Sequence, residues 1–451
     1  MNIIIAGAGK TGLTLAQQLA AEGHDITLID RDSRVLESAV ERYDAMAMWG
    51  NAASKAVLLE AGVEKADLLI ASTDADEVNL LCCMTAHGIN RNIHTIARIR
   101  DPEYGDQVMT MPEVFPLSLT VNPEKRAAVE IERLLKFPGF LRRDTFAKGQ
   151  VTIVELRIGQ DSKLCNVSLR DMGGIVKCRV LVCAVLRDGT AVAPSGNFVL
   201  QSGDRIFVTA PTADLATLLS SLKIVTRRVR SVLICGGGRV SYYLAKLLED
   251  DNIDVKLLDK DHDRCVELAA QLPDATVVYG DCSIQQVLED QGLRSADALC
   301  SLTGMDDTNI LISMYADSVG VSQVITKLSR GKNALTGSLS LGSLICPKEL
   351  CSNDIVRYVR AMQNQTGAAI SVHTIADGQA EAVEFLVDGF AKHRDTPLKM
   401  LKLKNNVLIA SITHGTQTEI PNGDSKFTEG DTVVVVTSGR GVLKQINDIF
   451  A

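Results

Sequence analysis

The chain has 451 residues, more than the roughly 250–300 at which a single hydrophobic core stops growing, so we expect several domains. Apolar residues make up 46% of it and charged residues 23%, which is typical of globular proteins and excludes disordered and collagen-like chains. The net charge of −8 argues against nucleic acid as a partner, because phosphate binding requires a basic face. Aromatic residues are only 4% of the chain, and Trp49 is the single tryptophan, so stacking on bases or sugars is not expected as a general strategy.

Nothing in the sequence predicts a membrane span or a signal peptide. No apolar stretch approaches the roughly 18–20 residues needed to cross a bilayer. The N-terminus has neither a basic segment nor a cleavage signature, so we expect a cytoplasmic protein. The 11 cysteines are scattered and form no C-x-x-C pair, which predicts reduced, mostly buried thiols and no metal site.

The chain is organised as a tandem repeat. A shift of 229 residues aligns 3–36 with 232–265, and further on the offset becomes 230. The first glycine of each repeat is Gly7 or Gly236, and the acid that follows it is Asp30 or Asp259. Similarity also extends to the end of each half, so the whole chain is a duplication.

Taken in chain order, short apolar segments alternate with amphipathic helices in the first part of each half. The predicted strands of the first half cover residues 3–6, 26–30, 45–49, 68–71, 95–99 and 115–119. Strands and helices that alternate at this spacing predict a parallel, doubly wound sheet. A helix follows at Pro123–Lys136, where Asn122 is placed to cap it, and its counterpart is Pro347–Met362.

The second part of each half has a different pattern. Strands are predicted at 151–158, 179–186 and 205–209, separated by turn residues, and this small α+β domain recurs at about 380–451. We therefore predict an α/β protein, a tandem duplication of a Rossmann-like parallel-sheet N-domain followed by a small α+β C-domain. The expected domains are 1–138 (the first N-domain, with its crossover helix), 139–226 (the first C-domain), 227–365 (the second N-domain) and 366–451 (the second C-domain).

The segment from Gly7 to Gly12 is a G-x-G-x-x-G loop between a strand and a helix. Its glycines allow a tight turn, a close approach of a pyrophosphate and close packing of helix on strand, and the helix N-terminus favours an anion. Asp30 ends the second strand, where a carboxylate accepts hydrogen bonds from ribose hydroxyls. This pattern favours NAD-type or adenosine ligands over NADP, although Arg31 and Arg34 weaken that preference. A Rossmann sheet without a ligand is the alternative.

The second half repeats this loop with one change. It reads Gly236-Gly-Gly-Arg-Val-Ser241, so a serine replaces the third glycine and tighter packing is expected there. Asp259 keeps the carboxylate of the second strand. The alternative is a duplicated sheet kept only for its shape.

Other candidate binding residues follow strands three, four and five, where ligands bind in open parallel sheets. Asn51 and Ala52 follow strand three, and Thr73 to Asn79 follow strand four. The residues from Thr73 onward could also cap the next helix, and the two roles are compatible. Arg98 aligns with Lys327, and this cation is expected to face either a ligand phosphate or a salt bridge at a domain interface.

We find no catalytic machinery. The seven histidines form no H-x-x-H pair, and no G-x-S-x-G motif is present. Hydride transfer would need an acid or base facing a nicotinamide, and the small domains offer only strands and turns. We therefore predict a protein that is not an enzyme and has no catalytic residues.

The order of these four domains, with a glycine loop, a Gly-Asn/Asp loop and a Thr…Asn loop in each half, resembles the TrkA family. Members of this family are regulatory subunits of bacterial Trk-type potassium uptake systems, and each half resembles an RCK (KTN) unit with a C-domain of the TrkA-C type. The resemblance implies binding of NAD(H), ATP and ADP. It also implies a homotetramer of eight RCK units that gates a membrane-embedded, channel-like Trk subunit from the inner face of the cell membrane.

By position, the resemblance assigns nucleotide-binding residues to both halves. For the first site they are Gly7, Ala8, Gly9, Lys10, Thr11, Gly12, Asp30, Arg31, Asn51, Ala52, Thr73, Asn79 and Arg98, and for the second site they are Gly236, Gly238, Arg239, Asp259, Lys260, Asp281, Cys282, Thr303 and Lys327. Ser241 departs from the family pattern, and Gly304 replaces Asp74, which puts the second site in doubt. The alternatives are a regulator of another cation transporter or antiporter and an NAD-dependent oxidoreductase.

Overall fold

A computed structural model describes residues 1–43, 45–136, 140–222, 228–329, 341–362, 369–438, 443 and 445–451. The chain divides into two compact units. The first unit comprises residues 1–127 and 347–359, and the second comprises 128–346 and 360–451.

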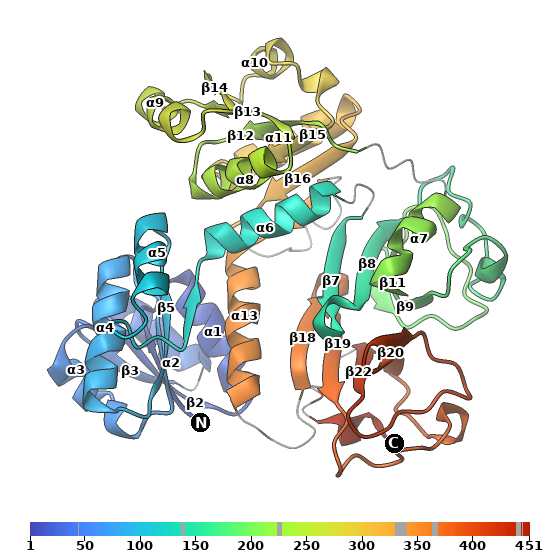
Figure 1. The fold of residues 1–451 in the computed structure, drawn as a ribbon, viewed down its shortest axis with the longest axis horizontal. Helices are drawn as coiled ribbons and strands as arrows, with labels where there is room; N and C mark the ends of the chain where they lie inside the picture. The colour runs from blue at the N-terminus through green and yellow to red at the C-terminus, as the bar shows by residue number, and fades with distance from the viewer. Residues whose placement is uncertain are drawn as a thin grey trace. The chain divides into compact units, whose positions relative to one another are not determined.

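A six-stranded parallel sheet forms the body of the first unit (Figure 1). Its strand order is β3-β2-β1-β4-β5-β6, with strands β1 Asn2–Ala6, β2 Asp25–Asp30, β3 Met46–Trp49, β4 Leu68–Ala71, β5 His94–Arg98 and β6 Leu119–Val121. The helices between them are α1 Lys10–Ala21, α2 Ser33–Tyr43, α3 Lys55–Glu60, α4 Asp76–Ile89 and α5 Pro102–Thr110. The order reverses between β1 and β4, so a crevice for a ligand is expected at the carboxyl ends of these strands.

The sixth strand is shifted from its predicted place. The prediction was 115–119, whereas β6 begins at Leu119. Pro116 has no amide hydrogen to give to a ladder, and the Phe115 amide donates instead to the Met111 carbonyl at the end of α5. The prediction for the following helix is confirmed: α6 covers Pro123–Lys136, and the Asn122 side chain accepts from the Lys125 amide at 2.9 Å.

The second unit contains a matching parallel sheet. Its order is β14-β13-β12-β15-β16-β17, with strands β12 Ser231–Cys235, β13 Asp254–Asp259, β14 Thr276–Tyr279, β15 Ala298–Ser301, β16 Gln323–Lys327 and β17 Ser343–Ile345. Its helices are α8 Arg239–Asp250, α9 His262–Gln271, α10 Gln285–Asp290 and α11 Asp306–Ser318. The predicted fold class is therefore confirmed, since both halves carry the same Rossmann-like sheet.

Two crossover helices are exchanged between the halves. Residues 128–136 of α6 belong to the unit of the second Rossmann sheet, where the Leu134 carbonyl accepts from Gln323 Nε2 at 2.8 Å. Helix α13 (Pro347–Met362) comes from the second half, yet its residues 347–359 belong to the first unit. There Tyr358 lies 2.9 Å from His94 at the start of β5, and Figure 1 shows α13 beside the first sheet.

Two antiparallel sheets of the same topology complete the second unit. The first has the order β10-β9-β11-β8-β7, with strands β7 Arg142–Phe146, β8 Val151–Arg157, β9 Leu181–Arg187, β10 Thr190–Val192 and β11 Arg205–Pro211, followed by helix α7 Leu215–Ser221. The second has the order β18-β19-β22-β20-β21, with strands β18 Ala369–Ile375, β19 Ala380–Leu386, β20 Val407–His414, β21 Gln417–Glu419 and β22 Thr432–Ser438.

These two sheets share one hydrophobic core. Phe146, Phe207 and Val434 are among the buried side chains from both sheets that form it. A hydrogen bond crosses the same boundary, because the Ala147 amide donates to Glu384 Oε1 at 2.9 Å. The two small α+β regions therefore form one packed body.

No helix in the described ranges is long and apolar enough to cross a membrane. All 11 cysteines are free thiols, and eight of them are buried.

Candidate nucleotide-binding sites

At two glycines of the loop in the first sheet, a side chain would collide with backbone atoms. Gly7 has a φ of +100°, and a Cβ on it would lie 2.9 Å from the Ser72 carbonyl carbon. A Cβ on Gly12 would lie only 1.9 Å from the Gly7 carbonyl oxygen. Nothing lies within 4 Å of a Cβ placed on Gly9. The loop therefore packs tightly at Gly7 and Gly12, whereas the space beside Gly9 is free of protein atoms.

Asp30 holds this loop in place. Its Oδ2 accepts from the Ala8 amide at 2.6 Å, and its Oδ1 accepts from the Asp32 amide at 2.9 Å. The Asp30 carbonyl also accepts from the Gly50 amide at 2.9 Å, which fixes the start of the loop after β3. Each carboxylate oxygen can accept a further bond, so a ribose hydroxyl can still reach Asp30.

Asn79 joins the loop after β4 to the end of β5. Its Oδ1 accepts from the Thr73 amide at 2.8 Å, and its Nδ2 donates to the Arg98 carbonyl at 2.8 Å. The expected helix-capping role of this loop is wrong, because the N-cap of α4 is Ala75 and receives no side-chain cap. The buried Asn79 amide is committed to the backbone of Thr73 and Arg98 instead, since a polar group this deep needs partners.

The Arg98 side chain is only 12% exposed and lies at the edge of this network. Its Nη2 donates to the Thr73 carbonyl and lies 3.5 Å from Oδ1 of the fully exposed Asp74. Burial and the neighbouring Arg100 lower the pKa of the Arg98 guanidinium, although an arginine keeps its charge at neutral pH. Arg98 Nε has no hydrogen-bond partner among the described residues. A pair with so exposed a carboxylate contributes about 0–1 kcal/mol, so this cation is available to an anion.

The remaining candidates of the first site surround this framework. Thr11 and Ala52 are buried, whereas Lys10, Arg31 and Asn51 are exposed. The structure therefore brings the predicted residues to the carboxyl edge of one sheet, with these polar side chains exposed. Their roles as ligand contacts stay predictions.

The second sheet repeats the same hydrogen bonds. The Asp259 carboxylate accepts from the Gly237 amide at 2.5 Å, and its carbonyl accepts from the Gly280 amide at 2.8 Å. Asn309 Oδ1 accepts from the Thr303 amide at 2.8 Å, and its Nδ2 donates to the Lys327 carbonyl at 2.9 Å. The framework of the first site is thus present twice.

Ser241 changes the second loop. Its hydroxyl is buried and donates to the Gly236 carbonyl oxygen. The counterpart of this oxygen in the first loop is that of Gly7, with which a side chain at Gly12 would collide. The second loop has Gly237 where the first has Ala8, and a Cβ there would lie 2.8 Å from Leu268. The second loop thus accommodates a serine at position 241, whose hydroxyl forms a hydrogen bond to the loop, while a side chain at position 237 would require Leu268 to shift.

The other candidates of the second site differ in exposure. Gly238, Arg239 and Lys260 are exposed and Cys282 is buried. Asp281 Oδ1 accepts from the amide and the hydroxyl of Ser283, and these bonds lower the pKa of Asp281.

Two residues of these frameworks were not among the predicted site residues. Asn309 aligns with Asn79 at the repeat offset of 230, and its hydrogen bonds show that it has the same place in the second framework. Arg264 Nε donates to the Gly237 carbonyl at 2.8 Å, and nothing in the spacing indicates this contact. Asp76 lies in the predicted segment after strand four; it is buried and accepts from the Arg100 amide at 2.6 Å, which secures the chain after β5.

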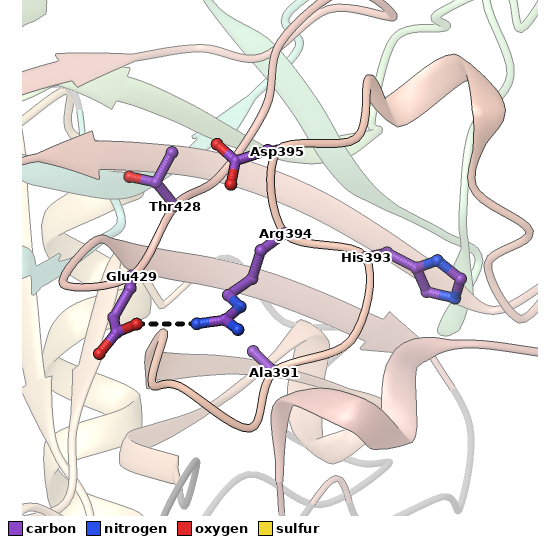
Figure 2. Close-up of a pocket in the computed structure, with 6 residues that line it drawn as sticks. All are labelled: Ala391, His393, Arg394, Asp395, Thr428 and Glu429. Atoms are coloured by element: carbon purple, nitrogen blue, oxygen red, sulfur yellow. Dashed lines mark hydrogen bonds and ion pairs between the residues drawn. The ribbon is translucent and has the colours of Figure 1, made fainter.

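A separate hollow of about 610 Å³ lies in the second antiparallel region. Figure 2 shows that Arg394 and Glu429, two of its lining residues, face each other, and they form an ion pair at 2.7 Å. The pairing offsets these two charges, and Asp395 and His393 also line the hollow. Among the described residues, no group of three or more His, Cys, Asp or Glu side chains could hold a metal ion.

Comparison with known proteins identifies known domains in both halves of the chain. The TrkA-N domain model matches residues 3–112 and 232–336, and the TrkA-C domain model matches 153–223. The Trk system potassium uptake protein TrkA of Haemophilus influenzae is 30% identical over 100% of this chain and 98% of its own length. The chain belongs to the TrkA family. The match of both halves to TrkA-N confirms the predicted repeat.

Solved structures place this TrkA-family chain among RCK folds. The crystal structure of the GsuK RCK domain has a TM-score of 0.60 at 16% identity, and covers 97% of this chain and 92% of that one. The GsuK channel bound to NAD has a TM-score of 0.60 at 17% identity, and covers 97% of this chain and 76% of that one. At these identities the likeness is one of fold.

Proposed function

We propose that this chain is the nucleotide-sensing regulatory subunit of a Trk-type potassium uptake system. It binds NAD(H), ATP or ADP at the carboxyl edges of its two Rossmann-like sheets. It acts as a homotetramer of eight RCK units on the inner face of the cell membrane, where it gates a membrane-embedded, channel-like partner. It performs no chemistry on its ligands.

The observation that carries this proposal is the duplicated framework of glycine loop, carboxylate and cation. Asp30 and Asp259 hold equivalent loops, and Asn79 and Asn309 tie equivalent strand ends together. This framework occurs in a chain that matches TrkA of a potassium uptake system over its full length. The GsuK channel bound to NAD has the same fold, which supports this class of ligand.

The first site fits a nucleotide. The open backbone at Gly9 leaves room for a pyrophosphate, and the N-terminus of α1 favours its charge. Asp30 has acceptor capacity left for ribose hydroxyls, and Arg98 Nε is a buried donor without a partner. When bound, the nucleotide would supply phosphate charge and ribose hydroxyls to these groups.

The two crossover helices α6 and α13 could connect nucleotide binding to gating, because both meet the first sheet near Arg98. Arg98 ends β5, and His94 at the start of the same strand lies 2.9 Å from Tyr358 of α13. Arg98 also pairs with Val121 at the end of β6, and α6 begins two residues further on. A phosphate that engages Arg98 would therefore change the surroundings of both crossover helices. A nucleotide shifts a conformational equilibrium only by its difference in affinity for the two states, so ATP and ADP must differ in these contacts to act differently.

Calorimetric titration of the full chain with NAD, NADH, ATP and ADP tests the proposal. We expect binding of at least one adenine nucleotide, and loss of it in the double variant Asp30→Ala, Asp259→Ala. Asp32→Ala serves as the control, because Asp32 lies beside Asp30 without holding a glycine loop. Absence of heat and of any thermal shift with all four ligands would overturn the proposal.

A further inference from the structure

One exposed aromatic side chain stands at the carboxyl end of the third strand in each Rossmann-like sheet. Trp49 ends β3 and is 70% exposed, and Tyr279 ends β14 and is 63% exposed. The two positions are equivalent at the repeat offset of 230. Neither was among the predicted binding residues, because the low aromatic content argued against stacking as a general strategy.

The strand register places each aromatic beside the carboxylate of its site. Asp30 of β2 pairs directly with Trp49, and Asp259 of β13 pairs directly with Tyr279. Directly paired residues of neighbouring strands project from the same face of a sheet. Trp49 and Asp30 therefore lie side by side at the edge where the glycine loop begins.

The indole of Trp49 is also held in a fixed place. Its Nε1–H donates to the Arg31 carbonyl at 3.0 Å, so the ring is tied to the chain just after Asp30. Ordinary folding would bury so large an apolar surface, and this side chain stays 70% exposed. A ring that is both anchored and open to solvent is suited to contact a flat ligand.

The order of the strands indicates which part of a ligand would reach this ring. Strand β2 lies between β1, which carries the glycine loop, and β3, which carries Trp49. If the phosphates lie at Gly9 and the ribose at Asp30, the base extends away from the loop, towards β3. We propose that Trp49 is the base-contacting residue of the first site, and that Tyr279 has this role in the second, so that each site selects an adenine-type base. This inference rests on the proposed nucleotide binding.

The chain provides its own probe, because Trp49 is its only tryptophan. ADP is titrated into the full chain while calorimetry measures binding and tryptophan emission reports the first site. Inorganic pyrophosphate, which lacks a base, is titrated in parallel. The variants are Trp49→Ala and the conservative Trp49→Phe for the first site and Tyr279→Ala for the second. The matched control is Phe390→Ala, an aromatic side chain that is 75% exposed and lies outside both Rossmann-like sheets.

In the wild-type chain we expect ADP to change the tryptophan emission. Trp49→Ala should weaken ADP binding at the first site by about 5- to 150-fold, the range that loss of one base–aromatic stack produces. Trp49→Phe should restore most of the affinity, and pyrophosphate should bind the wild type and Trp49→Ala equally. Tyr279→Ala should weaken ADP binding at the second site only, and Phe390→Ala should change neither the affinity for ADP nor the change in emission.

The outcomes separate this inference from the proposed function. If calorimetry detects no ADP binding to the wild type, the proposed function fails. If ADP binds the wild type and Trp49→Ala equally and tryptophan emission does not change, nucleotide binding stands and the role of Trp49 is overturned. An equal loss of ADP and pyrophosphate affinity in Trp49→Ala would also overturn the role of Trp49, because the residue would then support the glycine loop. A change in the mass of the assembly would overturn it as well, because Trp49 would then contact another copy of the chain.

Discussion

We infer that Arg98 is the residue at which the proposed site would distinguish ATP from ADP. Its charged side chain is partly buried and donates to the Thr73 carbonyl, and its Nε has no hydrogen-bond partner in the described part of the chain. An additional phosphate strengthens a charge-assisted hydrogen bond to such a guanidinium. Lys327 in the second half donates to the Leu302 carbonyl at 2.9 Å and has the corresponding place.

We predict that Arg98→Ala flattens the ratio of ATP affinity to ADP affinity at the first site, because it removes the cation that reads the number of phosphates. Calorimetry with both nucleotides measures the ratio, and Lys327→Ala is the control for the second site. Binding of both nucleotides as tight as in the wild type would show that Arg98 does not face a phosphate.

At the residue scale, the sequence predicted groups that follow from a motif and missed those that follow from packing. Gly12 and Asp30 could be predicted because a G-x-G-x-x-G loop requires them at fixed spacings. Asn79 was predicted, but its bonds to Thr73 and Arg98 replace the expected helix cap. Arg264 reaches the Gly237 carbonyl from α9, and no local pattern encodes a contact over 27 residues.

At the scale of elements, the two glycine loops solve the same packing problem in different ways. We predict that Gly12→Ser destabilises the first sheet by about 1–3 kcal/mol or more, because its Cβ would lie 1.9 Å from the Gly7 carbonyl oxygen.

Ser241→Ala should lower the free energy of unfolding by about 1–3 kcal/mol, because it leaves the buried Gly236 carbonyl without its hydroxyl donor. Thermal unfolding measures both. A Gly12→Ser chain as stable as the wild type would mean that the two loops are interchangeable.

The strands of the paired antiparallel sheets carry an acid-sensitive contact. Asp144 of β7 lies 2.9 Å from His373 Nδ1 of β18 and 2.7 Å from Arg142 Nε. Burial raises the pKa of the Asp144 carboxyl, but the charge of Arg142, followed by that of His373 and their hydrogen bonds, outweighs it and holds the pKa well below its usual range.

A depressed carboxyl pKa stabilises the folded state above the unfolded value of about 3.9, and this contribution is lost as the pH falls through the folded pKa. We therefore predict that Asp144→Asn lowers stability at pH 7 by about 1–3 kcal/mol. The difference from the wild type should shrink below about pH 4, where the unfolded carboxyl takes up its proton. Thermal unfolding between pH 3 and pH 7 measures this trend, and a difference that does not vary with pH would refute it.

Element bounds were predicted best where local signals are strong. Helix Pro123–Lys136 was predicted to the residue, since Asn122 caps it and Pro123 begins it. The strand predicted at 115–119 was displaced because Pro116 interrupts the ladder. The exchange of α6 and α13 between the halves has no local signature, because it depends on which sheet each apolar face meets.

At the scale of the whole molecule, two equivalent helices leave apolar side chains exposed. Leu81 and Met84 on α4 have their counterparts in Leu311 and Met314 on α11, and all four are exposed. Repeated exposure of large apolar groups is typical of surfaces that contact other proteins. Closed homo-oligomers use such repeated surfaces in a ring.

We predict that the double variant Leu81→Glu, Leu311→Glu dissociates the proposed homotetramer, because a charge at each contact cannot be desolvated. Analytical ultracentrifugation measures the mass of the assembly. Gln17→Glu, an exposed position on α1, is the control for added charge. A tetramer of unchanged mass in the double variant would place the contact elsewhere.

The central claim is that nucleotides bound to this chain control potassium flux through a membrane partner. The most direct test is potassium flux in proteoliposomes that hold the Trk-type membrane subunit of the same organism, measured with this chain and either ATP or ADP. We predict flux rates that differ between the two nucleotides, and loss of that difference in the double variant Asp30→Ala, Asp259→Ala. A rate that is the same with ATP, with ADP and without nucleotide, while the chain is bound to its partner, would contradict the account.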